Sequence, residues 1–194
     1  MTLPARDSKL IEIVDAALAD AARRAGPRLV CRPGCDACCH GAFAISMLDA
    51  ARLRSGLSAL RAAEPAQAET IEAKAHAWIA EHGRDFPGDP ATGLLDESDE
   101  GQERFEAFAN EARCPLLTDE GRCALYAARP MTCRVFGPPV RMEGGGLGCC
   151  ELCFQGSTEQ EIDGCEMRLP HALEEALEAE TGAGLTVVAF ALTR

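Results

Sequence analysis

The sequence predicts a mainly helical protein with a small β-hairpin, folded as a single compact domain over residues 1–194. Three observations support this fold class. The length suits one domain with a modest core. Apolar residues make up 47% of the chain, which is enough to form a core, and they recur at helical spacing in several segments. Aromatic residues make up only 5%, so we expect a core built mostly from Ala and Leu.

Three helices are predicted in the first half of the chain. Apolar residues at helical spacing predict the first over residues 7–25, where a Gly-Pro pair ends it. Ser46 and Asp49 have the spacing of a capping box and predict a second helix that runs to about Leu60. A proline in the first turn and a glycine just past the end predict the third over residues 65–82.

The second half of the chain is predicted to form shorter elements. Residues 84–101 are rich in Pro, Gly and acidic residues, which predicts an exposed loop, and a short helix follows from about Asp99. CPLLTDEGRCALY, residues 114–126, predicts a small hairpin with its turn at Asp-Glu-Gly. The remaining expectations are a short helix from Pro130, a loop over 137–148, helices near 158–163 and 170–180, and a C-terminal strand or packed tail.

Charge and hydropathy exclude several classes of partner. The chain has 19 basic and 31 acidic residues, a formal charge of −12, which disfavours nucleic acid and anionic membranes. No apolar run approaches the length of a membrane span. Acidic residues interrupt the N-terminal apolar segment, unlike the core of a signal peptide. We therefore expect a cytoplasmic protein whose thiols stay reduced, with no nucleic-acid or membrane partner.

Eleven cysteines are the most informative feature, and four of them fall within CRPGCDACCH, residues 31–40. An odd number cannot all form disulfides. Thiolate is a soft ligand that suits zinc and iron–sulfur clusters, and either site needs about four ligands. Turns such as Cys35-x2-Cys38 aim two sulfurs at one centre. The candidate ligands are Cys31, Cys35, Cys38, Cys39, Cys114, Cys123 and Cys133.

Other interpretations of these thiols stay open. Cysteine is often a buried apolar residue, and disulfides are the other alternative, although four cysteines in ten residues at turn spacing favour a metal over both. Cys38 completes the turn, whereas its neighbour Cys39 is a ligand to a second metal, a hydrogen-bonded neighbour of the first metal or a reactive thiol beside the site. A further segment over residues 149–165 completes the first site, forms a second or holds spare thiols. Its candidate ligands are Cys149, Cys150 and Cys153.

Two blocks of sequence, CRPGCDACCH and ARCPLLTDEGRCALYAARPMTCRVFG, resemble the YkgJ-type cysteine-cluster proteins, a family named for chelating zinc or iron. The resemblance implies a metal site more firmly than an activity. A related segment occurs in flagellin lysine methylase, which the resemblance links to an iron–sulfur centre. The matched positions are Cys31, Gly34, Cys35, Cys38, Cys39, Cys114, Pro115, Leu117, Cys123, Tyr126, Arg129, Pro130, Cys133, Arg134 and Phe136.

Two arginines of the motif, Arg129 and Arg134, flank Cys133. A metal held by four thiolates carries net negative charge, so these guanidinium groups are candidates to offset it and to donate hydrogen bonds to sulfur. Ordinary surface ion pairs are the equally weighted alternative.

These observations predict a domain organised around a cysteine-ligated metal site, with an iron–sulfur cluster, [4Fe-4S] in type, or zinc as its cofactor. A redox or accessory role is the first hypothesis. The alternatives are an S-adenosylmethionine-dependent methylase related to the flagellin enzyme and a structural zinc module for protein interactions. The three-residue gap after Cys31 and the Cys114-Pro115 pair slightly favour a cluster. Enzymatic activity, substrate, protein partner and oligomeric state stay open.

Overall fold

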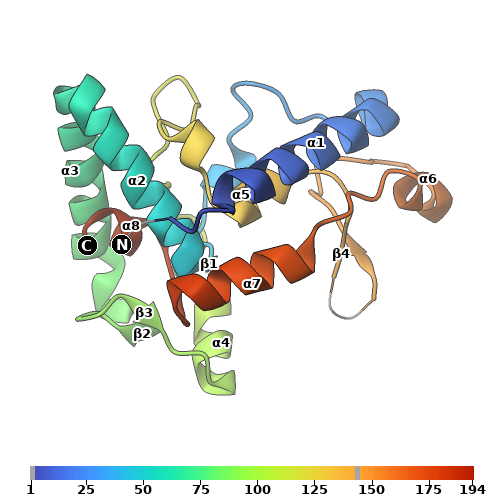
Figure 1. The fold of residues 1–194 in the computed structure, drawn as a ribbon. Helices are drawn as coiled ribbons and strands as arrows, with labels where there is room; N and C mark the ends of the chain where they lie inside the picture. The colour runs from blue at the N-terminus through green and yellow to red at the C-terminus, as the bar shows by residue number, and fades with distance from the viewer. Residues whose placement is uncertain (1–2, 143–144) are drawn as a thin grey trace.

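A computed structural model describes residues 3–142 and 145–194, and this part of the chain is mainly helical, as the sequence predicts (Figure 1). The long helices begin and end within a few residues of the predicted bounds. The α-helices are α1 (Asp7–Ala25), α2 (Met47–Ala63), α3 (Pro65–His82), α4 (Asp99–Glu106), α5 (Met131–Val135), α6 (Glu159–Asp163), α7 (His171–Thr181) and α8 (Val188–Leu192).

The described strands are two residues long and form antiparallel pairs. The pairs are β1 (Ile45–Ser46) with β6 (Leu185–Thr186), β2 (Gly88–Asp89) with β3 (Leu94–Leu95), and β4 (Val140–Arg141) with β5 (Leu147–Gly148). The first pair joins distant parts of the chain: it sets the start of α2 beside the segment that leads into α8.

Two segments predicted as loops form hairpins instead. In the segment over 84–101, the carboxylate of Asp89 accepts a hydrogen bond from the backbone N–H of Ala91, and Gly93 N–H donates to the Asp89 carbonyl. The Pro- and Gly-rich composition thus marks a tight turn between β2 and β3 rather than an open loop. The second segment, over 137–148, pairs as β4 and β5, although its residues 143–144 lie outside the described residues.

Helices α2 and α3 lie side by side, with α8 packed against both (Figure 1). Their shared core is aliphatic, and several of its alanines have no exposed surface, which lets the helices approach closely. The expectation of an Ala- and Leu-rich core is met here. A second part of the core is aromatic: Trp78, Phe86, Phe108 and Phe190 pack edge-on or tilted, with ring centroids of neighbouring rings 4.6–5.8 Å apart.

Helix α1 packs on α5 and α7 through a separate apolar cluster that includes Leu10, Val14, Met131 and Leu177. The predicted apolar face of α1 is therefore the face it buries. At the edge of this contact, Arg134 on α5 donates to the Asp15 carboxylate on α1 at 2.7 Å, and this ion pair links the two helices. The short α5 has too few residues to be stable alone, so α1 holds it in place.

A buried ion network joins the starts of three helices. The Arg52 guanidinium on α2 donates to Asp7 of α1 at 2.7 Å and to Asp49 at 2.5 Å, and all three residues are at most 6% exposed. Asp49 Oδ1 also accepts the backbone N–H of Met131 at 2.9 Å, at the start of α5. Ser46 caps α2 as predicted, accepting from Asp49 N–H, but the Asp49 carboxylate faces inward instead of completing a capping box.

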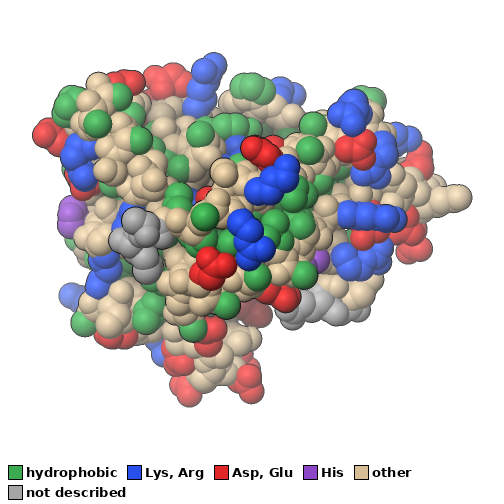
Figure 2. Space-filling view, in the orientation of Figure 1, with side chains coloured by type: hydrophobic (Ala, Val, Ile, Leu, Met, Phe, Trp, Pro, Cys, Tyr) green, Lys and Arg blue, Asp and Glu red, His purple; other side chains and the backbone are tan. Residues whose placement is uncertain are grey.

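Charged side chains of both signs are interspersed over the face shown in Figure 2. Within the described residues no helix combines the length and hydropathy needed to cross a bilayer.

We predict that Arg52→Ala lowers the free energy of unfolding by about 3–5 kcal/mol, because it leaves two buried carboxylates without their partner. Urea unfolding followed by circular dichroism measures this. Arg61→Ala is the matched control on the same helix: its ion pair with Glu72 is exposed, so its loss costs at most about 1 kcal/mol. Equal destabilisation by the two variants would contradict the role given to the network.

Candidate metal centre

Backbone pairing brings the two sequence blocks together. Cys114 N–H donates to the Cys39 carbonyl at 2.8 Å, and Gly41 N–H donates to the Ala112 carbonyl at 2.9 Å. His40 and Arg113 form the antiparallel bridge between these bonds. The end of CRPGCDACCH is therefore a strand-like partner of the segment that enters the second block. This pairing sets the two cysteines next to each other although 75 residues separate them in sequence.

The second block doubles back on itself, as the sequence predicts. Leu117 and Cys123 form an antiparallel bridge, and Ala124 N–H donates to the Leu116 carbonyl at 2.8 Å. The predicted hairpin is thus present as a tight loop with a single bridge. Its turn includes Gly121 at φ +71°, a conformation that favours glycine. The loop brings Cys123 back toward Cys114.

Cys133 reaches the same region from α5. Pro130 precedes the helix in an extended conformation, at φ −55° and ψ 157°, and starts it as predicted. The bond from Met131 N–H to Asp49 anchors this first turn to α2. The position of Cys133 therefore depends on the buried ion network.

Five thiols, contributed by three separate segments, form what we call the central cluster: Cys38, Cys39, Cys114, Cys123 and Cys133. Burial raises the pKa of Cys114 to about 11, and the neighbouring sulfurs of Cys123 and Cys38 add to this. Burial and the nearby thiols likewise raise the pKa of Cys133, and burial raises that of Cys123. Crowding without a metal thus keeps most of these sulfurs protonated.

Cys38 differs from the others. The Cys39 thiol donates a hydrogen bond to its sulfur, and this is the main reason that the pKa of Cys38 falls to about 6; the Arg129 guanidinium contributes in the same direction. The same bond raises the pKa of Cys39. Cys38 and Cys39 thus both interact electrostatically with other thiols of the central cluster.

The two motif arginines occupy different places. Arg129 is 7% exposed, and its positive charge acts on Cys38 and Cys123. Its guanidinium lies 3.8 Å from the centroid of the Tyr126 ring, over its face, and donates to the Tyr126 carbonyl. Arg134 is buried in its ion pair with Asp15 and also donates to the Ala127 carbonyl. Arg129 is therefore the arginine placed to offset thiolate charge.

The remaining cysteines lie in a second place. Cys31, Cys35, Cys150 and Cys153 influence one another electrostatically, and we call them the outer group. Cys149 is exposed, and Cys165 is buried beside the outer group among apolar residues. The structure thus divides CRPGCDACCH between two groups: its first two cysteines lie with the accessory segment and its last two with the second block.

The donors of the central cluster are all thiols, which fits a soft metal such as zinc or the iron of a cluster. All eleven cysteines are free thiols in this structure. Among the described residues, no three Cys, His, Asp or Glu side chains already stand in a metal-binding arrangement. Binding would need the thiols to turn toward a common centre and to release their protons.

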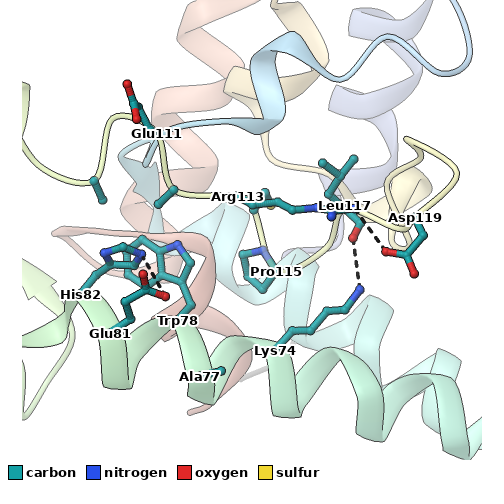
Figure 3. Close-up of a pocket in the computed structure, with 13 residues that line it drawn as sticks. Lys74, Ala77, Trp78, Glu81, His82, Glu111, Arg113, Pro115, Leu117 and Asp119 are labelled. Carbon is teal, nitrogen blue, oxygen red and sulfur yellow. Dashed lines mark hydrogen bonds and ion pairs between the residues drawn. The ribbon is translucent and has the colours of Figure 1, made fainter.

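A groove of about 640 Å³ on the α3 side reaches one thiol of the central cluster. Cys114 lines it, together with Trp78, His82 and Arg113. Figure 3 shows Lys74 reaching from α3 to the Leu117 carbonyl and Arg113 extending along the groove toward Asp119. Sequence patterns did not point to this groove, because its polar residues carry no motif and its walls come from segments far apart in the chain.

A family model described as "CxxCxxCC: Putative zinc- or iron-chelating domain" matches residues 30–144. This match covers more than half of the chain and contains the whole central cluster. The chain belongs to this family. The match ends before Cys149, so it leaves the accessory cysteines out. No curated protein and no solved structure matches the chain in the corresponding searches.

We predict that Cys38 is the fastest-alkylated thiol of the central cluster in reduced, metal-free protein at pH 7. With a pKa of about 6 it is mostly thiolate there, and its rate falls as the pH drops through 6. Iodoacetamide labelling at pH 5 and 7 with peptide mass spectrometry measures this. Cys149 is the control for exposure, since it is exposed but burial raises its pKa. Equal rates for Cys38 and Cys114 at both pH values would contradict the prediction.

Proposed function

We propose that this chain is a metal-binding protein that holds an iron–sulfur cluster, or else zinc, through the central cluster, and that it has a redox or accessory role. The observation that carries the proposal is the convergence of five thiols from three segments of the chain on one place beside a buried guanidinium. Membership of a family named for chelating zinc or iron supports the same chemistry.

Each residue of the centre has a definite part in this proposal. Cys38 offers a ready thiolate, and Cys39 holds it in place by donating a hydrogen bond. Cys114, Cys123 and Cys133 lose their protons as the metal binds, so affinity rises with pH. Arg129 offsets part of the negative charge that four thiolates leave on the site.

We favour the iron–sulfur form of the site. Within the central cluster, the Cys114-Pro115 pair favours an iron–sulfur cluster, whereas four thiolates suit zinc equally well. When bound, a cluster supplies a one-electron redox centre, and zinc supplies a fixed link between loops. The groove at Cys114 opens onto the centre, which supports contact with a redox partner or small molecule.

The test is purification without oxygen, followed by a visible spectrum, elemental analysis and a melting curve. We expect a brown protein that contains iron and sulfide. Cys123→Ser and Cys133→Ser should lose the metal and melt well below the wild type, because metal binding supplies part of the folding free energy of these loops. Cys165→Ser, a buried cysteine outside the cluster, should keep both. Colourless protein with stoichiometric zinc would overturn the iron–sulfur form, and metal-free protein with an unchanged melting temperature would overturn the proposal.

We also predict that Arg129→Met weakens metal binding by roughly 10- to 100-fold without abolishing it, because Arg129 offsets charge and is not a ligand. Competition with a chelator of known affinity measures the change. Arg122→Met is the control, since Arg122 neighbours Cys123 in sequence but is exposed. Equal affinity in the two variants would show that Arg129 acts only through its packing on Tyr126.

A further inference from the structure

The outer group joins two turns that lie far apart in the sequence. The Sγ atoms of Cys31 and Cys153 are 4.0 Å apart, although 122 residues separate them. On the first turn, Cys35 N–H donates to the Arg32 carbonyl at 2.9 Å. On the second, Cys153 N–H donates to the Cys150 carbonyl at 2.9 Å. Each turn thus presents two cysteines on a short, hydrogen-bonded piece of backbone.

Backbone hydrogen bonds hold the second turn against Arg28, which precedes the first turn in the chain, and against Gly137, which lies beside Cys31. Cys150 N–H donates to the Gly137 carbonyl at 3.2 Å, and Phe154 N–H donates to the Arg28 carbonyl at 2.9 Å. Gly137 lies at φ +131°, and a Cβ there would stand 2.9 Å from the Cys31 sulfur. A side chain is excluded at this position by both the conformation and the sulfur. These contacts place the second turn close to Cys31.

The outer group lies at the edge of the apolar interior: Cys31 is exposed and Cys35 half-buried, whereas Cys150 and Cys153 are buried. Cys150 and Cys153 are 8% and 3% exposed and pack with Ala25 and Phe154. Burial, then Cys153, Cys35 and Cys150, raise the pKa of Cys31 to about 12.

We propose that Cys31, Cys35, Cys150 and Cys153 form a second metal site that takes a soft divalent ion such as zinc. Two thiolates at about 2.3 Å from a tetrahedral zinc ion lie about 3.8 Å apart, close to the observed separation of the Cys31 and Cys153 sulfurs. Cys35 and Cys150 supply the third and fourth ligands once their side chains rotate toward the same centre. The ligands of this site are distinct from those of the central cluster, and half of them lie beyond the family match.

The test titrates the reduced, metal-free full chain with Co²⁺, whose thiolate complexes are coloured, and then displaces it with Zn²⁺. We expect Cys31→Ser and Cys153→Ser each to lose one bound metal per chain and to leave the second. Cys123→Ser should lose the other one, so failure at the central cluster is distinguishable from failure here. Cys165→Ser is the matched control, buried in the same apolar cluster but not a ligand, and it should bind like the wild type.

A second measurement needs no variant and covers the case in which Cys153→Ser fails to fold. Zn²⁺ should protect Cys31 and Cys153 of the wild-type chain from alkylation by at least tenfold, as peptide mass spectrometry reports. Full metal stoichiometry in Cys31→Ser and Cys153→Ser, or no protection of these thiols by Zn²⁺, would overturn the proposal. Isolation of the chain with a Cys31–Cys153 disulfide under anaerobic, reducing conditions would also overturn it.

Discussion

The Arg52 guanidinium and the two carboxylates that enclose it are the interaction on which the rest of the structure depends. Arg52 donates to Asp7, the first residue of α1, and to Asp49 in the first turn of α2. Asp49 in turn accepts the backbone N–H of Met131, the first residue of α5. Removing three charged groups from water costs several kcal/mol per ion, so the network is stable only because each charge has close partners. The network therefore contributes more to the relative placement of the three helices than to the net free energy of unfolding. It determines where α5 begins, and thereby where Cys133 stands relative to the other thiols of the central cluster.

The cysteine loops themselves have little regular structure. The bond between Cys114 and Cys39 and the single bridge at Leu117 hold them, with 3₁₀ turns and glycines at positive φ between. Residues 31–40 contain no buried residue, so few apolar contacts resist the opening of this loop, whereas Leu116 and Leu125 of the second block are buried in the core. Helices α1, α2 and α5 supply a rigid frame on one side, and the groove by α3 leaves the other side accessible at Cys114. A rigid frame that carries one loosely packed ligand loop, residues 31–40, is an arrangement in which metal binding contributes directly to folding.

Much of this could be predicted from the sequence, and the limits are physical. Apolar periodicity and capping residues predict α1, α2 and α3, because these signals are local. Cysteine spacing predicts that CRPGCDACCH and the second block meet. The division of the thiols into two groups could not be predicted, because it separates Cys35 from Cys38, which the turn spacing predicts to share one centre, and depends on which distant segment each sulfur meets. Asp49 was assigned to a helix cap, and its inward role depends on Arg52 and Met131 lying within reach in three dimensions. The β2–β3 hairpin was missed because two-residue strands carry no alternating pattern.

The loop over residues 31–40 belongs to both groups of thiols, and this has a consequence for how metals bind. Only Asp36 and Ala37 separate Cys35 of the outer group from Cys38 of the central cluster. Once a metal holds one end of so short a loop, most of the conformational entropy of the other end is already lost. The second metal then binds to a loop that is already ordered, so the two proposed sites favour each other without exchanging any contact. Because such coupling is reciprocal, loss of the outer group's metal would weaken the central cluster by the same factor that loss of the central metal weakens the outer group. Cys35 and Cys38, on one short loop, thus connect two proposed metal centres whose other ligands come from separate parts of the chain.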